Sequence, residues 1–293
     1  MNRFIPLFLT IVLAVLQVPK AGAQYQTRLA LDKKTFLSQE PMRATINISN
    51  NSGTDIIMGG PANSNWLSFQ LEDTSGRTYP PVGVEVEEPF VFKAGASMQR
   101  QILISDTHSI SEVGTYSVTA VVYHAPTQAY YQSNRVRFAV TEVKAFWEQD
   151  FGVPAGMNDA GRVRKYSLHV LREDEGSRLY FRLTDDRSQM RLATFSLGPI
   201  SLALDPSFTM DSQNRLQVFF LAAPKIFVHC ILGPDGELIS RKYYKEGEKN
   251  DRPLLAQRGG EIFVSGGIPF DPTAPVITPQ ETGRKASQRP PGL

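Results

Sequence analysis

Thiol and imidazole side chains are scarce in this chain of 293 residues, which contains one cysteine and four histidines. A single cysteine excludes an intrachain disulfide. The histidines show no His-x-x-x-His spacing, and the chain has neither a Gly-x-Ser-x-Gly elbow nor a glycine-rich phosphate loop. The sequence therefore predicts no metal, no cofactor and no catalytic residue, and it indicates a protein that is not an enzyme.

A large excess of one charge sign is also lacking. The chain has 31 Lys and Arg residues against 29 Asp and Glu residues. Loss of residues 1–23 would remove Arg3 and Lys20 and leave 29 of each sign. Nucleic-acid binding normally needs a concentrated basic face, so nucleic acid is not an expected partner.

Long apolar runs are missing everywhere except at the N-terminus. Arg3 precedes an apolar run at residues 4–18, and the small residues AGA follow at 21–23. This order predicts a secretory signal peptide at residues 1–23, cleaved before Gln24. The run is shorter than the roughly 20 residues that span a bilayer. We therefore expect an exported protein, periplasmic or extracellular, with no transmembrane segment after cleavage.

Residues 24–143 consist of short β-prone segments separated by turn clusters such as NNSGTD and DTSGRTYP. In one of them Ala44, Ile46 and Ile48 alternate with polar residues, and three further segments alternate in the same way at 67–71, 116–122 and 136–140. Alternation with a period of two predicts antiparallel strands that cover one core. Six or seven such strands in about 115 residues are typical of a two-sheet sandwich.

The stretch SEVGTYSV at 111–118 resembles the tyrosine-corner segment of immunoglobulin-like domains. Tyr116 stands at the tyrosine position, and Val118 stands where that family has its second core cysteine. The partner position on an earlier strand, Ala44 or Ile46, is not cysteine either. The resemblance implies a bacterial-type immunoglobulin-like or fibronectin-like sandwich without a disulfide.

Such sandwiches present binding loops at their ends. The segment YHAPTQAYYQSN at 123–134 joins the last two expected strands, and it holds Tyr130 and Tyr131. Tyrosine offers a rigid contact surface to a sugar or a protein. Tyr130 and Tyr131 are therefore the candidate binding residues, with packing of one of them on the sheet edge as the alternative.

Residues 144–163 break the alternation and predict an interdomain linker. Residues 164–270 predict a second antiparallel β domain, in which GSRLYFRL (176–183), QNRLQVFF (213–220) and GGEIFVSG (259–266) are similar to one another. These units resemble the blade repeats of secreted propeller proteins. A closed propeller needs at least about four blades, so we expect blade-like units without a closed ring. The proline-rich residues 271–293 predict a disordered tail.

His229 and Cys230 are neighbours, which suggests a metal or nucleophile site. Successive side chains of a strand point to opposite faces, so the two residues cannot act together from the strand KIFVHCIL. Cys230 is predicted to be a small buried residue and His229 a core or edge histidine.

The sequence favours an all-β, exported, non-enzymatic protein that binds a protein or a glycan at the cell envelope or has a structural role there. One alternative is a secreted carbohydrate-active hydrolase that uses two carboxylates of the second domain, with Asp185, Asp186, Asp205 and Asp211 available. The other alternative is a β-sandwich protease inhibitor whose loop 123–134 enters a protease cleft. Self-association is left open.

Overall fold

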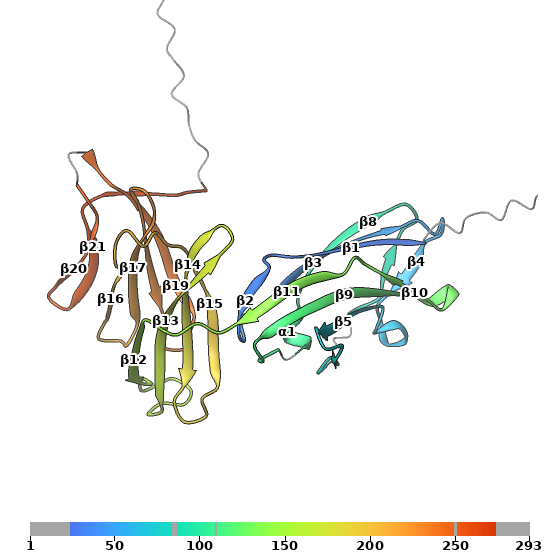
Figure 1. Ribbon diagram of the computed structural model, residues 1–293, viewed down its shortest axis with the longest axis horizontal. Coiled ribbons are helices and arrows are strands. Elements are labelled where there is room, and N and C mark those ends of the chain that lie inside the picture. Colours follow the sequence, from blue (N-terminus) through green and yellow to red (C-terminus); the bar gives the residue numbers. More distant parts are fainter. Residues whose placement is uncertain (1–23, 84–86, 109, 249–250, 274–293) are drawn as a thin grey trace, which may run out of the picture. The chain divides into compact units, whose positions relative to one another are not determined.

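The computed structural model describes residues 24–83, 87–108, 110–248 and 251–273. The expected signal peptide and residues 274–293 of the expected tail lie outside this range. The chain divides between Glu142 and Val143 into two compact units, each described by itself. Both units are built from small β-sheets, which confirms the all-β prediction (Figure 1).

The first unit contains two main sheets. One has the order β1-β3-β8, and its strands are β1 (Tyr25–Leu31), β3 (Arg43–Asn50) and β8 (Ser97–Leu103). The other has the order β2-β11-β9-β5-β6, with strands β2 (Thr35–Leu37), β11 (Val136–Thr141), β9 (Gly114–His124), β5 (Leu67–Asp73) and β6 (Thr78–Tyr79). β10 (Ala129–Gln132) also pairs with β9. All of these pairs are antiparallel except β2 with β11.

Short elements complete the first unit. They are the two-stranded sheet of β4 (Ile56–Met58) and β7 (Phe90–Phe92), the helix α1 (Ile104–Thr107), and the 3-10 turns η1 (Pro61–Asn63) and η2 (Ala125–Thr127). No described helix is long and apolar enough to cross a bilayer.

The core of the first unit lies between its two main sheets. The alternating residues Ala44, Ile46 and Ile48 are all buried in it, as the sequence predicts. The cluster also contains Phe36, Phe69, Val118 and Phe138. Full burial of one large apolar side chain stabilises a fold by about 1.5–3 kcal/mol. Packing of this kind accounts for a unit that has no disulfide.

Tyr116 ties the start of β9 to the preceding corner. Its ring is buried between Tyr79 and Phe138, with centroid distances of 5.6 Å to both. Its hydroxyl donates a hydrogen bond to the carbonyl oxygen of Glu112 at 2.8 Å. This bond fixes the turn from which β9 begins.

Removing that hydroxyl in a Tyr116→Phe variant is expected to lower the free energy of unfolding by about 1 kcal/mol, the net contribution of a typical intramolecular hydrogen bond. Urea unfolding of the full chain measures the change. Tyr130→Phe is the control, since Tyr130 is exposed and its hydroxyl makes no hydrogen bond to another described residue. Equal stabilities of the two variants would contradict a structural role for the Tyr116 hydroxyl.

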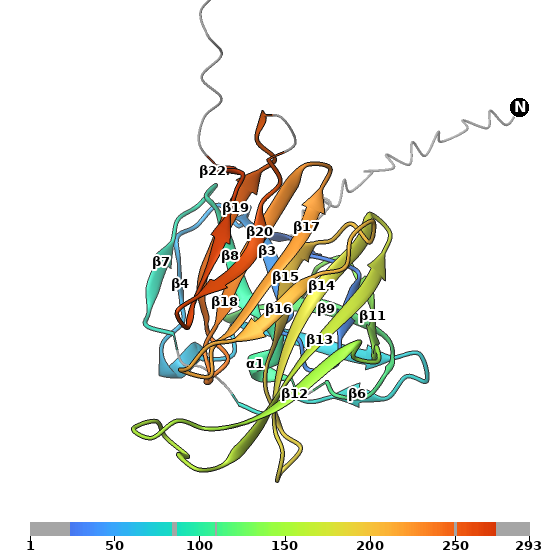
Figure 2. The same ribbon diagram turned by 90° about the vertical axis from the view of Figure 1, so that its left-hand side faces the viewer.

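The second unit consists of two larger sheets and a hairpin (Figures 1 and 2). The four-stranded sheet follows chain order: β12 (Trp147–Gly152), β13 (Val163–Glu173), β14 (Gly176–Asp185) and β15 (Arg191–Pro199). The five-stranded sheet has the order β16 (Ser207–Met210), β17 (Leu216–Ala223), β18 (Ile226–Leu232), β19 (Leu238–Lys245) and β22 (Ile268–Phe270). The hairpin is β20 (Leu254–Arg258) with β21 (Glu261–Ser265).

The two larger sheets share one core, which includes Tyr166, Phe181, Val218, Val228 and Cys230. The hairpin β20–β21 packs on the other face of the five-stranded sheet, where Leu255 and Val264 lie against Phe219, Leu221 and Phe227. β12 falls within residues 144–163, the expected linker, and it pairs with β13 along its whole length. That segment therefore contributes a strand to the second unit.

The three similar segments of the second unit fall in β14, β17 and β21. Each is the second strand of a hairpin, and each belongs to a different sheet. The three segments are similar because each consists of a polar turn followed by a strand. The sheets of the described residues are not hydrogen-bonded into a closed ring of blades, which confirms that expectation.

Three hairpins use the same five-residue turn, at 73–77, 211–215 and 233–237. In each, the first amide donates to the fifth carbonyl and the fourth amide donates to the first carbonyl. The fourth residue has positive φ: 85° at Gly76, 57° at Asn214 and 91° at Gly236. This is the type I turn with a bulge residue in the left-handed region, which favours glycine or asparagine. The Pro-Asp-Gly sequence at 234–236 thus forms a hairpin turn, as its composition indicates.

Candidate functional site

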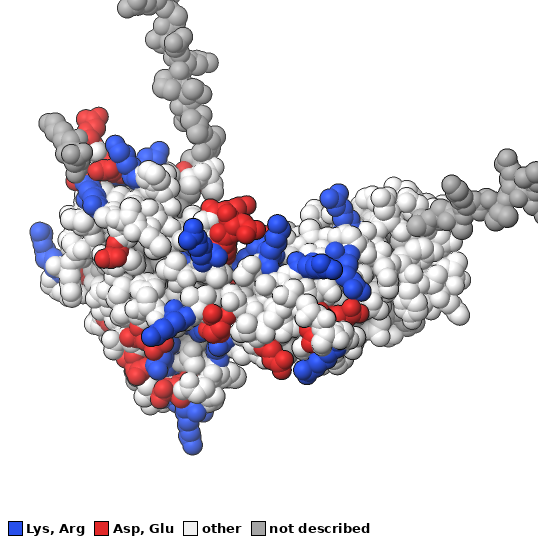
Figure 3. Space-filling model, in the orientation of Figure 1, with Lys and Arg blue, Asp and Glu red and all other residues white. Residues whose placement is uncertain are grey.

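Two long stretches of the first unit contain no charged residue. Residues 56–71 and 113–134 contain no Lys, Arg, Asp or Glu. They supply β4, η1, η2 and β10, together with most of β5 and all of β9. Figure 3 shows both charge signs interspersed over the visible face of the second unit, and neither sign on the visible face of the first unit at the end that carries β4 and β10.

The two candidate tyrosines are placed differently on β10. Tyr130 is 70% exposed, and its ring lies on that of Tyr123 at a centroid distance of 4.9 Å. Tyr131 is half-buried against the core and meets the buried Tyr25 ring edge-on at 5.4 Å. Tyr130 therefore presents its ring to solvent, and Tyr131 anchors the hairpin.

The tip of this hairpin is held by His124. Its Nδ1 atom accepts a hydrogen bond from the Thr127 amide at 3.3 Å and lies 2.5 Å from the Thr127 hydroxyl. Burial lowers the pKa of His124, which favours the neutral ring that can accept these bonds. The turn that presents Tyr130 is thus fixed by side-chain contacts as well as by the β9–β10 ladder.

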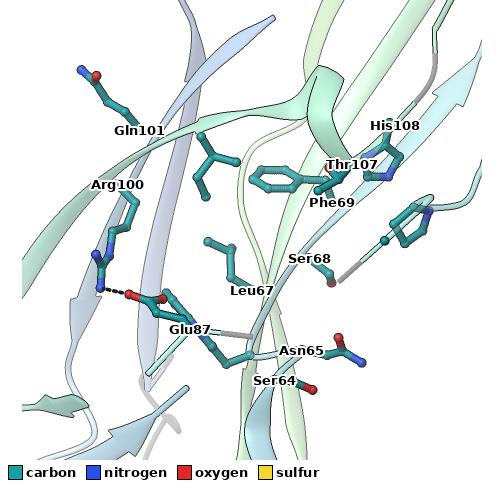
Figure 4. A pocket seen from close by; sticks show the side chains of 14 residues that line it. Ser64, Asn65, Leu67, Ser68, Phe69, Glu87, Arg100, Gln101, Thr107 and His108 are labelled. Carbon is teal, nitrogen blue, oxygen red and sulfur yellow. Dashed lines mark hydrogen bonds and ion pairs between the residues drawn. The ribbon is translucent and has the colours of Figure 1, made fainter. Parts of the chain in front are cut away.

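A cleft of about 350 Å³ lies in the first unit beside β5 and β8 (Figure 4). Trp66, Leu67, Phe69 and Ile102 supply apolar surface. Arg100, on β8, forms an ion pair with Glu87, with 2.6 Å between Nη2 and Oε1. The volume of the cleft is within the range of small-ligand sites, and the cleft is lined by apolar walls with a few polar groups.

Two polar groups of the cleft are buried. The Nε atom of Arg100 has no hydrogen-bond partner among the described residues, although the guanidinium lies 5.0 Å above the Phe90 ring. His108 is only 2% exposed, and its Nδ1 atom lies 2.9 Å from the Thr107 hydroxyl. Burial lowers the pKa of His108, so its ring is neutral near pH 7. Because the charges of Arg100 and Glu87 cancel and His108 is neutral, these three lining side chains together carry no net charge.

Cys230 and His229 lie on opposite faces of β18, as predicted. Cys230 is fully buried in the core between the two larger sheets, and burial raises the pKa of its thiol to about 11. His229 lies on the other face beside Phe219, and its Nε2 is 2.9 Å from Oε1 of Gln217. The cysteine is therefore protonated and enclosed, and the pair forms no common site.

The His229 ring belongs to a buried polar chain. Gln217 donates from its side-chain nitrogen to Asp211 at 3.1 Å, and Arg215 donates from Nε to the same carboxylate oxygen at 2.7 Å. Because the Gln217 oxygen accepts, Nε2 of His229 carries the proton. Burial, with a smaller contribution from Lys242, lowers the pKa of His229 to about 4. These hydrogen bonds connect the turn that follows β16 to β17 and β18.

Two of the four acidic residues considered for sugar hydrolysis, Asp185 and Asp211, accept hydrogen bonds within turns. Asp185 accepts hydrogen bonds from the amide and the hydroxyl of Ser188, which lower its pKa. Burial alone would raise the pKa of Asp211, but hydrogen bonds from Arg215, Gln213 and Gln217 outweigh it, and the pKa is lowered. A general acid needs a raised pKa. In the described ranges, no group of three or more His, Cys, Asp or Glu side chains is placed to hold a metal ion.

No protein-family profile and no curated protein matches the sequence. Among solved structures, an alkylpurine DNA glycosylase of Pseudomonas fluorescens bound to abasic-site DNA is 11% identical at a TM-score of 0.27, over 41% of this chain and 31% of that one. A β-glucosidase of Erythrobacter marinus is 10% identical at 0.27, over 40% and 15%. A mutant β-glucosidase of Listeria innocua with laminaribiose is 13% identical at 0.27, over 40% and 16%. The chain spans less than a third of each of these proteins.

Proposed function

We propose that the protein is an exported, non-enzymatic binding protein whose first unit is an immunoglobulin-like sandwich. The strand orders β1-β3-β8 and β11-β9-β5 correspond to the A-B-E and G-F-C orders of that fold. The hydrogen bond from Tyr116 to Glu112 supports the same assignment, since it has the tyrosine-corner pattern. Export rests on the sequence pattern of residues 1–23.

The binding surface is the hairpin surface around Tyr130 within the uncharged residues 113–134, and the partner is an electrically neutral glycan or protein surface at the cell envelope. The observation that carries this proposal is the exposed Tyr130 ring, supported from beneath by Tyr123. Tyrosine side chains lose little conformational entropy on binding and present both an apolar face and a hydroxyl. The absence of charge from residues 56–71 and 113–134 favours a neutral partner.

Tyr130→Ala is expected to weaken retention of the partner about tenfold or more, because a central aromatic contact commonly contributes 2 kcal/mol or more. Binding is measured with the full chain on a glycan array and against envelope extracts. Val113→Ala is the matched control: Val113 is 63% exposed and precedes β9 at the end opposite Tyr123. The absence of any reproducible partner, or equal binding by both variants, would contradict the proposal.

The alternatives are less well supported. The general acid of a hydrolase needs a raised pKa, and two of the four candidate carboxyl groups, Asp185 and Asp211, have lowered pKa values. A protease inhibitor presents an exposed loop that protrudes into the protease cleft. Within residues 123–134, residues 129–132 form the ladder-paired strand β10, and Tyr131 packs against the buried Tyr25.

A further inference from the structure

β8 is the outer strand of the three-stranded sheet, and β3 covers only one of its edges. Two backbone bonds frame their ladder: the Ile104 amide donates to the Met42 carbonyl and the Asn50 amide to the Ala96 carbonyl, both at 2.9 Å. In an antiparallel ladder, hydrogen-bonded and non-hydrogen-bonded pairs alternate. The backbone N–H and C=O groups of Gln99 and Gln101 therefore point away from β3. No described strand pairs with that edge.

The opposite edge of the same sheet is capped at its middle. The side-chain amide of Asn134 accepts a hydrogen bond from the Leu29 N–H and donates one to the Leu29 C=O, both at 3.0 Å. It satisfies the outward backbone groups at the middle of β1 in place of a neighbouring strand. The outer strands of the second sheet, β2 and β6, have only three and two residues. Among the described strands of the first unit, β8 is thus a seven-residue edge strand whose outward backbone groups are not capped by another described residue.

The cleft adjoins this edge. Arg100 and Ile102 of β8 line it, with Trp66 and Phe69 among its other walls (Figure 4). The site combines an open backbone edge with an apolar recess beside that edge. The outward N–H and C=O groups of Gln99 and Gln101 are spaced to form hydrogen bonds with the backbone of an extended polypeptide. When such a polypeptide adds to a sheet as a strand, its main-chain hydrogen bonds supply affinity and side-chain pockets supply specificity.

We propose that β8 binds an extended peptide segment of a partner protein as an additional strand of the sheet. One apolar or aromatic side chain of the segment enters the cleft between Ile102 and Phe69. This site is separate from the Tyr130 surface, and it does not depend on the function proposed there.

The test uses proline, which removes a backbone donor. The N–H of Gln101 faces the open edge, so Gln101→Pro deletes an outward donor and leaves the ladder with β3 in place; proline is tolerated in edge strands at such positions. Gln101→Ala is the matched control, since it shortens the same exposed side chain and keeps the N–H. Gln99→Pro makes the same deletion two residues away, in case Gln101→Pro fails to fold.

The probe is a library of random seven-residue peptides displayed on phage and selected on the full chain. We expect enriched peptides with alternating apolar residues, which bind Gln101→Pro at least tenfold more weakly than the wild type and Gln101→Ala within twofold of it. In the complex, hydrogen exchange at the Gln99 and Gln101 amides should slow at least tenfold, and Tyr130→Ala should leave peptide binding unchanged.

Other outcomes would overturn the proposal. These are an absence of enriched peptides, equal binding to the proline and alanine variants, or unchanged exchange at both amides. Dimers of the full chain that form through β8 and are lost in Gln101→Pro would assign the edge to a second copy of the chain instead.

Discussion

Replacing Gly236 by alanine is expected to lower the free energy of unfolding by about 3 kcal/mol. Two effects combine at this position. The backbone has a φ of 91°, which an L side chain rarely adopts, and an added Cβ would lie 2.7 Å from the Cβ of Ala193 and 3.2 Å from a methyl group of Leu183. The turn between β18 and β19 packs directly on β14 and β15, so the second unit has no room for the methyl group.

The matched control is Gly76→Ala. Gly76 occupies the same position of the same turn type at a φ of 85°, but nothing lies within 4 Å of an added Cβ. The backbone effect alone is about 1 kcal/mol there. Thermal and urea unfolding of the full chain measure both variants. A loss of stability no greater for Gly236→Ala than for Gly76→Ala would show that the contact between turn and sheet can relax without cost.

Acidification from pH 7 to pH 5 is expected to cost about 2 kcal/mol of stability through His229 alone. The ring is neutral in the folded state with a pKa of about 4. Its ordinary value of about 6.5 applies to the unfolded chain. The unfolded state therefore binds a proton more readily, and stability falls as the pH drops below about 6.5 and levels off below about 4.

The variant His229→Gln removes this titration and keeps an amide able to hydrogen-bond to Gln217. It is expected to be less stable than the wild type at pH 7 and to lose about 2 kcal/mol less between pH 7 and pH 5. Burial also lowers the pKa values of His108 and His124, so the comparison between variant and wild type isolates His229. Equal losses in both proteins would assign the acid sensitivity to other groups.

Local alternation was sufficient to predict which strand faces are buried. Ala44, Ile46 and Ile48 lie in the first core, and Cys230 lies in the second, with His229 on the opposite face. These features follow from the two-residue period of a strand, which the sequence displays directly. The turn at 233–237 was predictable for a similar reason, since Pro-Asp-Gly has the backbone preferences of that turn.

The cleft was not predictable from the sequence. Its walls come from β5, β8 and the segment that contains Glu87, which are separate in the chain and meet only when the two sheets pack. The ion pair of Arg100 with Glu87 joins two residues that no local period relates. The sequence contains one indication of it. Arg100 lies between Met98 and Ile102 in the two-residue alternation of β8, and those two neighbours face the core.

The bond between Leu29 and Asn134 has a consequence for how the first unit acquires its structure during synthesis. The two residues are 105 positions apart, and the parallel pairing of β2 with β11 joins residues 35–37 to 139–141. The first strands of the unit therefore stay incomplete until nearly all of it has been synthesised. Contacts of such long sequence separation slow folding, because loop closure precedes the stabilising interactions. A chain that ends before Asn134 would leave β1 as exposed as β8, with two unsatisfied edges on one sheet.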